Sequence, residues 1–458
     1  MSDRRSTSGR LLMEQNATQQ PTKKLPPRAY LLGSLLSSAQ GMYAPFMMTY
    51  MIDMNASFTE LGAFRSVGNI APAILQPAWG AGSDKVGHKN LFVAFGSLTG
   101  LLTVYLFLWA RTPFEMIVLY AIQSILFSIQ IPTWLSLVGS FIDEDKRGNE
   151  LGRLDMATRL TALIATLVSG FLIGLEGLVT LLRNTLGEVG VFLLPPSQAL
   201  GEPYYISFYL TAILGIIAAL ISITIHEKPL DKIKKREFPP VLRLLRKPGD
   251  FRRFCLVTIF FSFAMAMSWP YFTVILYGKL GATHFGVGIA SAVMALSAIA
   301  FTVPFGRLSD RIGRKPVIVF GRSILFLVPL LYAFAPNVYW IYAANTIAGI
   351  SIGSSWNAFT AYIYDIAPEE ERGAHLSVYN MFIGIVFLSG SLVAGVLGDV
   401  IGVFMEEYAV AFTMLVASGV LRFVASFFYL LLREPRDYAS NFWAEVRGFV
   451  HRERLDYP

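Results

Sequence analysis

Cysteine and charge are both scarce in this chain of 458 residues. The single cysteine, Cys255, excludes a disulfide framework and a metal site built from several cysteines. The sequence contains neither the HExxH pattern of zinc proteases nor the GxxxxGK[ST] loop that cradles nucleotide phosphates. Charged residues make up 15% of the chain, whereas about a quarter of an ordinary soluble protein is charged. We therefore expect neither an enzyme nor a protein with a metal or cofactor.

Apolar residues dominate instead, at 54% of the chain, with a mean hydropathy of +0.53. Apolar runs of roughly 20 residues, the length that crosses a bilayer, recur from near Arg28 to near Leu432. The first run is too long for a signal peptide and is predicted to remain as a helix. The composition predicts an all-α polytopic protein of a cell membrane, plasma or inner, with the lipid bilayer as its main surroundings.

Twelve transmembrane helices are predicted from these runs. The predicted spans are 29–52, 59–80, 90–110, 114–142, 156–176, 204–226, 254–277, 286–306, 316–335, 338–366, 377–399 and 408–432.

The basic residues orient this topology. Of the 38 lysines and arginines, the spans leave 31 on one side of the membrane, three on the other and four inside helices. The positive-inside rule then places both termini in the cytoplasm. An extra crossing between Glu176 and Pro203 would put the most basic loop outside, so we reject it. The net charge of +7 is thus explained by topology, and no nucleic-acid partner is expected.

Five parts follow from this topology. They are a cytoplasmic tail 1–28, a six-helix bundle 29–226, a basic cytoplasmic linker 227–253, a second six-helix bundle 254–432 and a cytoplasmic tail 433–458.

The two bundles carry an internal repeat. The segment Gly80–Lys89 (GAGSDKVGHK) reappears 226 residues later as Gly306–Lys315 (GRLSDRIGRK). A second landmark, with Arg147 before a glycine, recurs 225 residues later at Arg372. Two landmarks in the same order at one offset indicate a duplicated six-helix unit, a plan that secondary transporters use. A weaker third match aligns His226–Glu227 with Arg433–Glu434 at an offset of only 207 residues. The first half is therefore longer than the second, and the outer loop between helices 5 and 6 is the expected place of the extra residues.

At these residues the chain resembles the major facilitator superfamily, whose signature G-x-x-x-D-[RK]-x-G-[RH]-[RK] is matched in both copies. The resemblance implies two pseudo-symmetric six-helix bundles, with signature carboxylates that latch the halves together on the cytoplasmic side. Gly80 and Gly306 suit close helix approach, and Gly87 and Gly313 suit a left-handed turn. The predicted gating residues are Gly80, Asp84, Lys85, Gly87, His88, Lys89, Gly306, Asp310, Arg311, Gly313, Arg314, Lys315, Arg147 and Arg372.

The drug/proton antiporter branch of this superfamily is similar in layout, but two of its features are absent. Its G-P-x-x-G-G element in helix 5 is replaced here by Ala165–Gly174 (ATLVSGFLIG). The arginine expected early in helix 4 is also missing, and Gln123 is the nearest polar residue. Both departures weaken an assignment to drug antiport.

The resemblance further implies that helices 1, 4, 7 and 10 line a central cavity. Aromatic and amide side chains recur there at helical spacing. Because amide side chains that face lipid are costly, this face of the helices should be sheltered from lipid. Aromatic faces accept flat or apolar bodies, whereas amides bind hydroxyl or carbonyl groups. The predicted cavity residues are Gln40, Tyr43, Gln123, Gln130, Trp134, Trp269, Asn345, Trp356 and Asn357.

Charges inside the membrane are costly and indicate function by default. Asp155 and Arg159, four residues apart, are predicted to pair as a gate or relay, or simply as structure. Arg65 is a candidate for an anionic group or an outer gate, unless it extends toward the outer surface. Arg322 is expected to extend to the inner surface, and Arg422 has no evident partner. Since all four of these intramembrane charges are positive, organic anions stay open as substrates. No acidic residue lies near a predicted midplane, which leaves the coupling ion open.

The sequence favours a monomeric secondary transporter that moves a small organic solute by alternating access. Proton-linked efflux of amphipathic or drug-like compounds is the leading hypothesis. A facilitator or exchanger for sugars or organic anions is the first alternative, and a non-transporting receptor of similar fold is the second.

Overall fold

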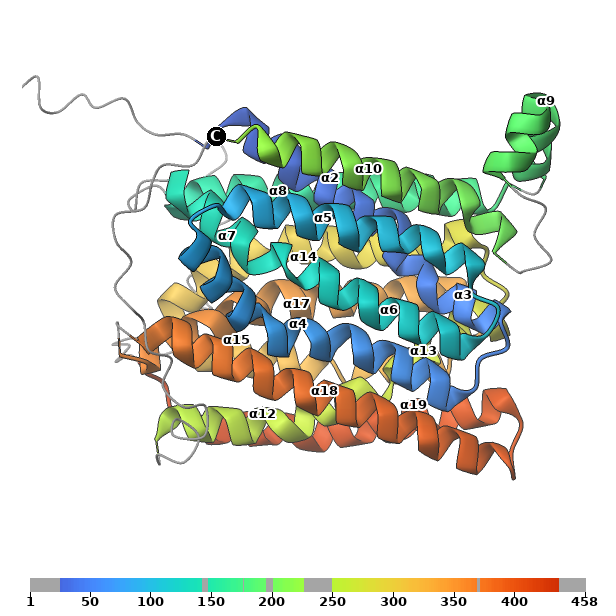
Figure 1. The fold of residues 1–458 in the computed structure, drawn as a ribbon. Coiled ribbons are helices and arrows are strands. Elements are labelled where there is room, and N and C mark those ends of the chain that lie inside the picture. Colours follow the sequence, from blue (N-terminus) through green and yellow to red (C-terminus); the bar gives the residue numbers. More distant parts are fainter. Residues whose placement is uncertain are drawn as a thin grey trace, which may run out of the picture.

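A computed structural model describes residues 25–141, 147–175, 177–194, 201–225, 249–368 and 371–435. Every regular element within these ranges is a helix (Figure 1). Most of the predicted tails and of the basic linker lies outside the described ranges.

The first half of the chain supplies six long helical units. Its elements are α2 (Pro27–Tyr43), η1 (Ala44–Phe46), α3 (Met47–Asp53), α4 (Phe58–Val86), α5 (Lys89–Leu106), η2 (Phe107–Trp109), α6 (Pro113–Ser128), α7 (Gln130–Phe141), α8 (Arg147–Ile173), α9 (Leu178–Leu193), η4 (Glu202–Tyr204) and α10 (Tyr205–Ile223).

The second half repeats this order. Its elements are α12 (Asp250–Met267), α13 (Trp269–Thr273), η5 (Val274–Lys279), α14 (His284–Ile312), α15 (Arg314–Ile324), α16 (Leu327–Ala333), α17 (Val338–Ile366), α18 (Arg372–Gly402), α19 (Glu407–Ser426) and η7 (Phe427–Leu431).

Within the described ranges, nine helical segments are long and apolar enough to cross a bilayer. The other three units, α2–α3, α4 and α17, pack among them, which gives the twelve predicted helices. We call the end of the bundle where α2 begins and η7 finishes the terminal end, at the left in Figure 1. The opposite end, where α3 finishes and α4 begins, is called the far end.

Helix packing follows the same scheme in both halves. In the first half α2 packs against α8 and α10, α4 against α6, and α5 against α10. The equivalent pairs in the second half are α12 with α18 and α19, α14 with α17, and α16 with α19. The most extensive contacts between the halves are those of α4 with α18 and of α8 with α14, and smaller ones join α4 to α13, η1 to α14 and α3 to η5. The repeated signature therefore marks a real duplication of a six-helix bundle.

Two glycines show how closely the helices approach. A Cβ atom at Gly349 would lie 2.4 Å from the carbonyl oxygen of Met294, and one at Gly353 would lie 2.6 Å from that of Ala298. Only hydrogen fits at these two positions of α17, so α14 can pack directly against its backbone.

The long loop between α8 and α10 forms a separate short helix. α9 stands beyond the far end of the bundle, at the upper right in Figure 1. It reverses at Gly187, whose φ of 57° suits glycine, and Arg183 holds the two arms by donating to the Leu194 carbonyl oxygen at 2.6 Å. The extra length lies where the repeat predicted it, and it makes no additional crossing.

Candidate functional site

The first helix of each half is broken at a proline. Pro45 separates α2 from α3, and Pro270 follows the break between α12 and α13. Proline lacks the N–H of a helical hydrogen bond and clashes with the preceding turn, so both helices bend there. The two prolines are 225 residues apart, which is the offset of the repeat. Our sequence interpretation missed this pair, although the offset could have revealed it.

Beyond these breaks a polar cluster joins the halves at the far end. The Asp53 carboxylate accepts hydrogen bonds from the hydroxyls of Tyr204, at 2.7 Å, and Tyr277, at 2.8 Å. The Tyr204 hydroxyl also lies 2.9 Å from Nε2 of His284. Asp53 and Tyr204 belong to the first half, whereas Tyr277 and His284 belong to the second. The bonds of Tyr277 to Asp53 and of His284 to Tyr204 thus join the two halves.

A second carboxylate binds across the same end. The Asp399 carboxylate accepts the backbone N–H groups of Phe58 and Thr59, both at 2.9 Å. These are free donors at the N-terminus of α4, where the helix dipole favours negative charge. One turn further on, a Cβ atom at Gly62 would lie only 2.5 Å from the Ser391 carbonyl oxygen. α4 and α18 are therefore in backbone contact near the far end.

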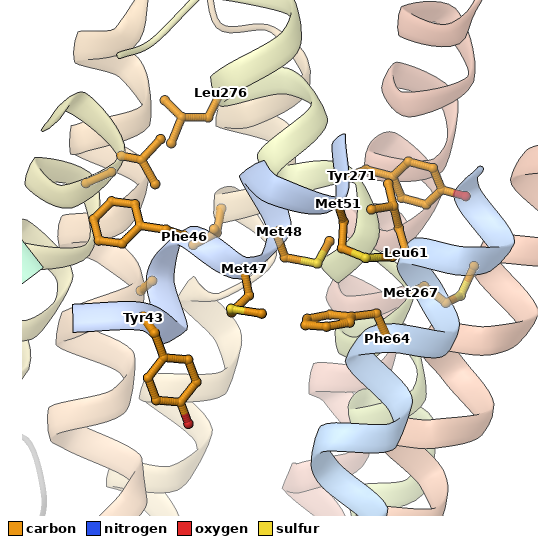
Figure 2. Packing of buried hydrophobic residues seen from close by; sticks show 14 of the residues in the cluster. Tyr43, Phe46, Met47, Met48, Met51, Leu61, Phe64, Met267, Tyr271 and Leu276 are labelled. Carbon is orange, nitrogen blue, oxygen red and sulfur yellow. The ribbon is translucent and has the colours of Figure 1, made fainter. Parts of the chain in front are cut away.

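A methionine-rich apolar layer lies next to these polar contacts. Figure 2 shows Met47, Met48 and Met51 of α3 among side chains of α4 and of the first helix of the second half. All three methionines are buried, as is Phe64. Methionine packs adaptably, which suits a contact that must form and separate. We call this layer together with the Asp53 and Asp399 contacts the far-end closure.

The contact between the halves differs toward the terminal end. α8 and α14 touch at Gly288, where an added Cβ would lie 3.3 Å from the Thr166 carbonyl oxygen. Closer to the terminal end a pocket of about 200 Å³ lies between them, lined by Arg159, Leu163 and Ala295 among others. Among the described residues, no hydrogen bond or ion pair joins the halves on the terminal side of Ser66, which bonds to the Leu388 carbonyl oxygen. Among the described residues, the hydrogen bonds between the halves therefore gather at the far end.

The first half brings several predicted cavity residues together. The Gln123 amide donates to the Tyr43 hydroxyl at 2.9 Å, and both side chains are buried. Gln130 is also buried, with its Oε1 atom unbonded, and the Trp134 ring lies against Gly33. Gln40, by contrast, is exposed. Helix 4 thus turns Gln123 toward helix 1, whereas Gln130 lies beside Gly96 of α5.

The second half divides its predicted residues between faces. Trp269 lies against Phe387, with ring centroids 4.8 Å apart, and the Tyr332 hydroxyl donates to the Asn345 side chain at 3.3 Å. Trp356 is 66% exposed and shares a helix face with Asn345. Asn357 is also exposed and is turned about 100° from Trp356 around the helix.

The signature hairpins lie at the terminal end. Gly87 adopts the predicted left-handed turn (φ 78°, ψ 8°), whereas Gly313 has a positive φ of 107° but an extended ψ. The Asp310 carboxylate accepts from Arg314 at 2.6 Å, and Arg314 also bonds to Asp365 at 3.2 Å. These three residues all belong to the second half, so no latch across the halves forms there among the described residues.

The other predicted gating residues have local roles or lie at the surface. Lys89 donates to Ser136, Arg372 to the Tyr364 carbonyl oxygen, and the Lys315 N–H to Glu434. The side chains of Lys85, His88 and Arg311 are exposed. Neither Gly80 nor Gly306 has a close neighbour in the other half. The side chains of Asp84 and Arg147 lie outside the described part of the chain.

The intramembrane charges differ from one another. Arg159 binds Asp155 at 2.7 Å on an exposed surface. Arg422 is 2% exposed and donates to the carbonyl oxygens of Met265 and Leu325 and to Ser268, bracing the broken end of α12. A cation there also suits the helix C-terminus. The expectation for Arg322 is wrong: it turns inward and lies over the Phe359 ring at 4.4 Å.

A larger pocket of about 400 Å³ is unrelated to this arrangement. It lies within the first half, at its far-end surface between η2 and α6, and is lined almost entirely by apolar side chains such as Trp109 and Phe114. Those two side chains are exposed, as expected on a lipid-facing surface.

Comparison with known proteins identifies the fold. The profile of the Major Facilitator Superfamily matches residues 29–277 and 254–455, one match for each half. The chain belongs to the Major Facilitator Superfamily. The resemblance found in the sequence is thereby confirmed, and the family and fold are those of multi-pass membrane transporters of small molecules.

Two members of this superfamily show the range of sequence similarity. The class H tetracycline resistance protein of Pasteurella multocida is 32% identical over 26% of this chain, and the match spans only 29% of that protein's length. The multidrug resistance protein MdtG of Klebsiella pneumoniae is 23% identical over 90% of this chain and 94% of its own. A solved structure of a mutant of the nucleoside transporter NupG has the same fold, with a TM-score of 0.70 at 14% identity, covering 90% of this chain and 100% of that one.

Proposed function

We propose that this protein exports amphipathic organic compounds by alternating access, in exchange for protons. The observation that carries the proposal is the unequal contact between the halves, since their hydrogen bonds among the described residues gather at the far end. With both termini in the cytoplasm, as the basic residues predict, this is an inward-open state that would receive a solute from the cytoplasm or the inner leaflet.

The candidate cavity supports an amphipathic solute. Trp134 and Trp269 are half-buried and Trp356 is exposed, so these rings offer aromatic surface, while the buried amides of Gln123 and Asn345 are bonded to Tyr43 and Tyr332. Such aromatic surface binds flat apolar bodies by burial and stacking. The named activities of the tetracycline and multidrug relatives agree with this class of solute.

The far-end closure supports coupling to protons. Asp53 and Asp399 are the carboxylates that join the halves in this state, and each accepts two hydrogen bonds. A protonated carboxyl group is a poorer acceptor, so proton binding from the outside would weaken the closure. The outward-open state would then release its solute, and exchange requires that the proton leaves toward the terminal end as the closure re-forms.

Flux measurements in proteoliposomes test this function. A panel of anionic, cationic and neutral amphiphiles, with glucose for comparison, would be followed with and without an imposed pH gradient. We expect amphiphile flux that increases with a gradient driving protons inward. Flux that ignores the gradient contradicts proton exchange, and flux of glucose alone contradicts amphiphile transport.

A further inference from the structure

Three arginines within the helical bundle have no carboxylate partner among the described residues. Arg65 lies in α4, Arg322 in α15 and Arg422 in α19, and none of them forms an ion pair there. An uncompensated charge in a membrane protein is costly and is retained where it serves a purpose.

Arg65 lies in α4 beside the contacts of the far-end closure. Its helix contacts the other half at Gly62 and Ser66, on either side of Arg65 in the sequence. The side chain is exposed although it lies among protein atoms, with Tyr120 close enough for electrostatic interaction. Arg65 is therefore an exposed cation between two buried residues of α4 that contact the other half. Tyr120 in turn lies near the Tyr43–Gln123 pair, so Arg65 adjoins the predicted cavity lining.

Arg322 is held flat between aromatic rings. Its guanidinium lies 4.4 Å from the centroid of Phe359 and 5.3 Å from that of Phe261. Cation–π contact stabilises the charge without using its N–H donors. The buried Nε atom has no hydrogen-bond partner, and Nη1 reaches only the sulfur of Met265 at 3.9 Å. The N–H groups of the Arg322 guanidinium, which can bind a carboxylate or sulfonate through two hydrogen bonds, are therefore largely without acceptors among the described residues.

Arg422 serves as an internal contrast. It is fully buried, and its two Nη atoms are occupied by Leu325, Met265 and Ser268. Its role is to support the broken helix, and it repels Arg322 nearby. That repulsion makes an added negative charge near Arg322 more favourable.

We propose that the solute is an organic anion, a carboxylate or sulfonate on an aromatic or apolar body. Arg65 binds the anionic group from the first half, and Arg322 provides attraction from the second half. This inference rests on the proposed export of amphiphiles and specifies their charge. It predicts that cations are excluded, since no carboxylate among the described residues lies beside Arg65 to receive them.

The test compares two dyes in proteoliposomes, the anion 6-carboxyfluorescein and the cation ethidium. We expect flux of the anion only, with a KM about tenfold higher in Arg65→Gln and partial recovery in Arg65→Lys, because one charge-assisted contact is lost. Arg111→Gln, at an exposed arginine of the far-end surface, is the matched control and should behave as wild type. Arg322→Gln should raise the KM for the anion as well.

A second measurement needs no variant. In the wild type, 8-anilinonaphthalene-1-sulfonate should inhibit carboxyfluorescein flux, whereas N-phenyl-1-naphthylamine, which has the same body without the sulfonate, should not. Ethidium flux without carboxyfluorescein flux, or an unchanged KM in Arg65→Gln, would overturn the anion inference and leave amphiphile export standing. If no member of the amphiphile panel moves, export and the anion inference both fall.

Discussion

The hydroxyl of Tyr277 donates a 2.8 Å hydrogen bond to the carboxylate of Asp53, and so joins the outer ends of the first helices of the two halves. Both residues lie beyond a proline break, at the ends of α3 and η5. The bond can exist only while the far end is closed. Its strength therefore contributes to the balance between the two states of the transporter.

Tyr277→Phe should shift this balance toward the far-end-open state. A hydrogen bond to a charged group contributes about 1.5–3 kcal/mol, so the ratio of open to closed molecules should rise about tenfold or more. Labelling of a Met48→Cys reporter by an impermeant thiol reagent from outside would report the change, in a background where Cys255 is replaced by alanine.

Tyr50→Phe is the matched control for that substitution. The Tyr50 hydroxyl donates to the Phe107 carbonyl oxygen at 3.2 Å, a bond that stays within the first half. Labelling of Met48→Cys should then be unchanged. Equal labelling rates in the Tyr277 and Tyr50 variants would contradict a role for Asp53–Tyr277 in holding the halves together.

Gly395→Ala should oppose the far-end closure by a steric route. The added Cβ atom would lie 2.4 Å from the carbonyl oxygen of Phe58 in the other half, so α18 and α4 would have to part. We expect slower solute flux and faster external labelling at the far end. At Gly402 of the same helix the nearest atom is 4.0 Å away, and Gly402→Ala should have neither effect. Normal flux in Gly395→Ala would show that this contact is dispensable.

Arg422→Met should lower stability without changing charge selectivity. The substitution leaves acceptors at the end of α12 unbonded, at a cost of roughly 2 kcal/mol in a membrane protein. The melting temperature in detergent should fall by roughly 4 °C. Exposed Arg252 provides the comparison, because Arg252→Met should leave the melting temperature unchanged. A change in the ratio of anion to cation flux in Arg422→Met would mean that this arginine faces the solute.

The Asp155–Arg159 pair should contribute little to stability. Its side chains are 54% and 40% exposed, and exposed pairs four residues apart on a helix contribute about 0.3–0.5 kcal/mol. A double-mutant cycle with Asp155→Asn and Arg159→Gln measures the coupling. A coupling energy well above 1 kcal/mol would refute this assignment as a weak surface pair.

The sequence revealed the architecture because lipid imposes strong patterns on a chain. Apolar runs and the asymmetry of lysine and arginine predicted twelve helices, and the repeated signature predicted two related halves. The closing contacts could not be predicted in the same way. Asp53 looked like an ordinary helix end, and its partner Tyr277 lies in the other half of the chain, so only the packed structure brings them together.

The candidate cavity was predicted in part. Helical spacing correctly placed Gln123 toward Tyr43, since periodicity determines which side chains share a face. It could not distinguish the direction of Arg322, because a long side chain near a helix end can extend to the surface or turn inward. The rings of Phe261 and Phe359, from two other helices, stabilise the inward direction here.

Distances between spin labels test the alternating-access claim most directly. One pair would join Asn55 and Phe404, exposed residues of the two halves at the far end, and the other would join Val86 and Arg307 at the terminal end. With Tyr277→Phe, or at low external pH with solute, we expect the far-end distance to lengthen while the terminal-end distance shortens. Distances that change together, or that stay fixed during active transport, would contradict the account.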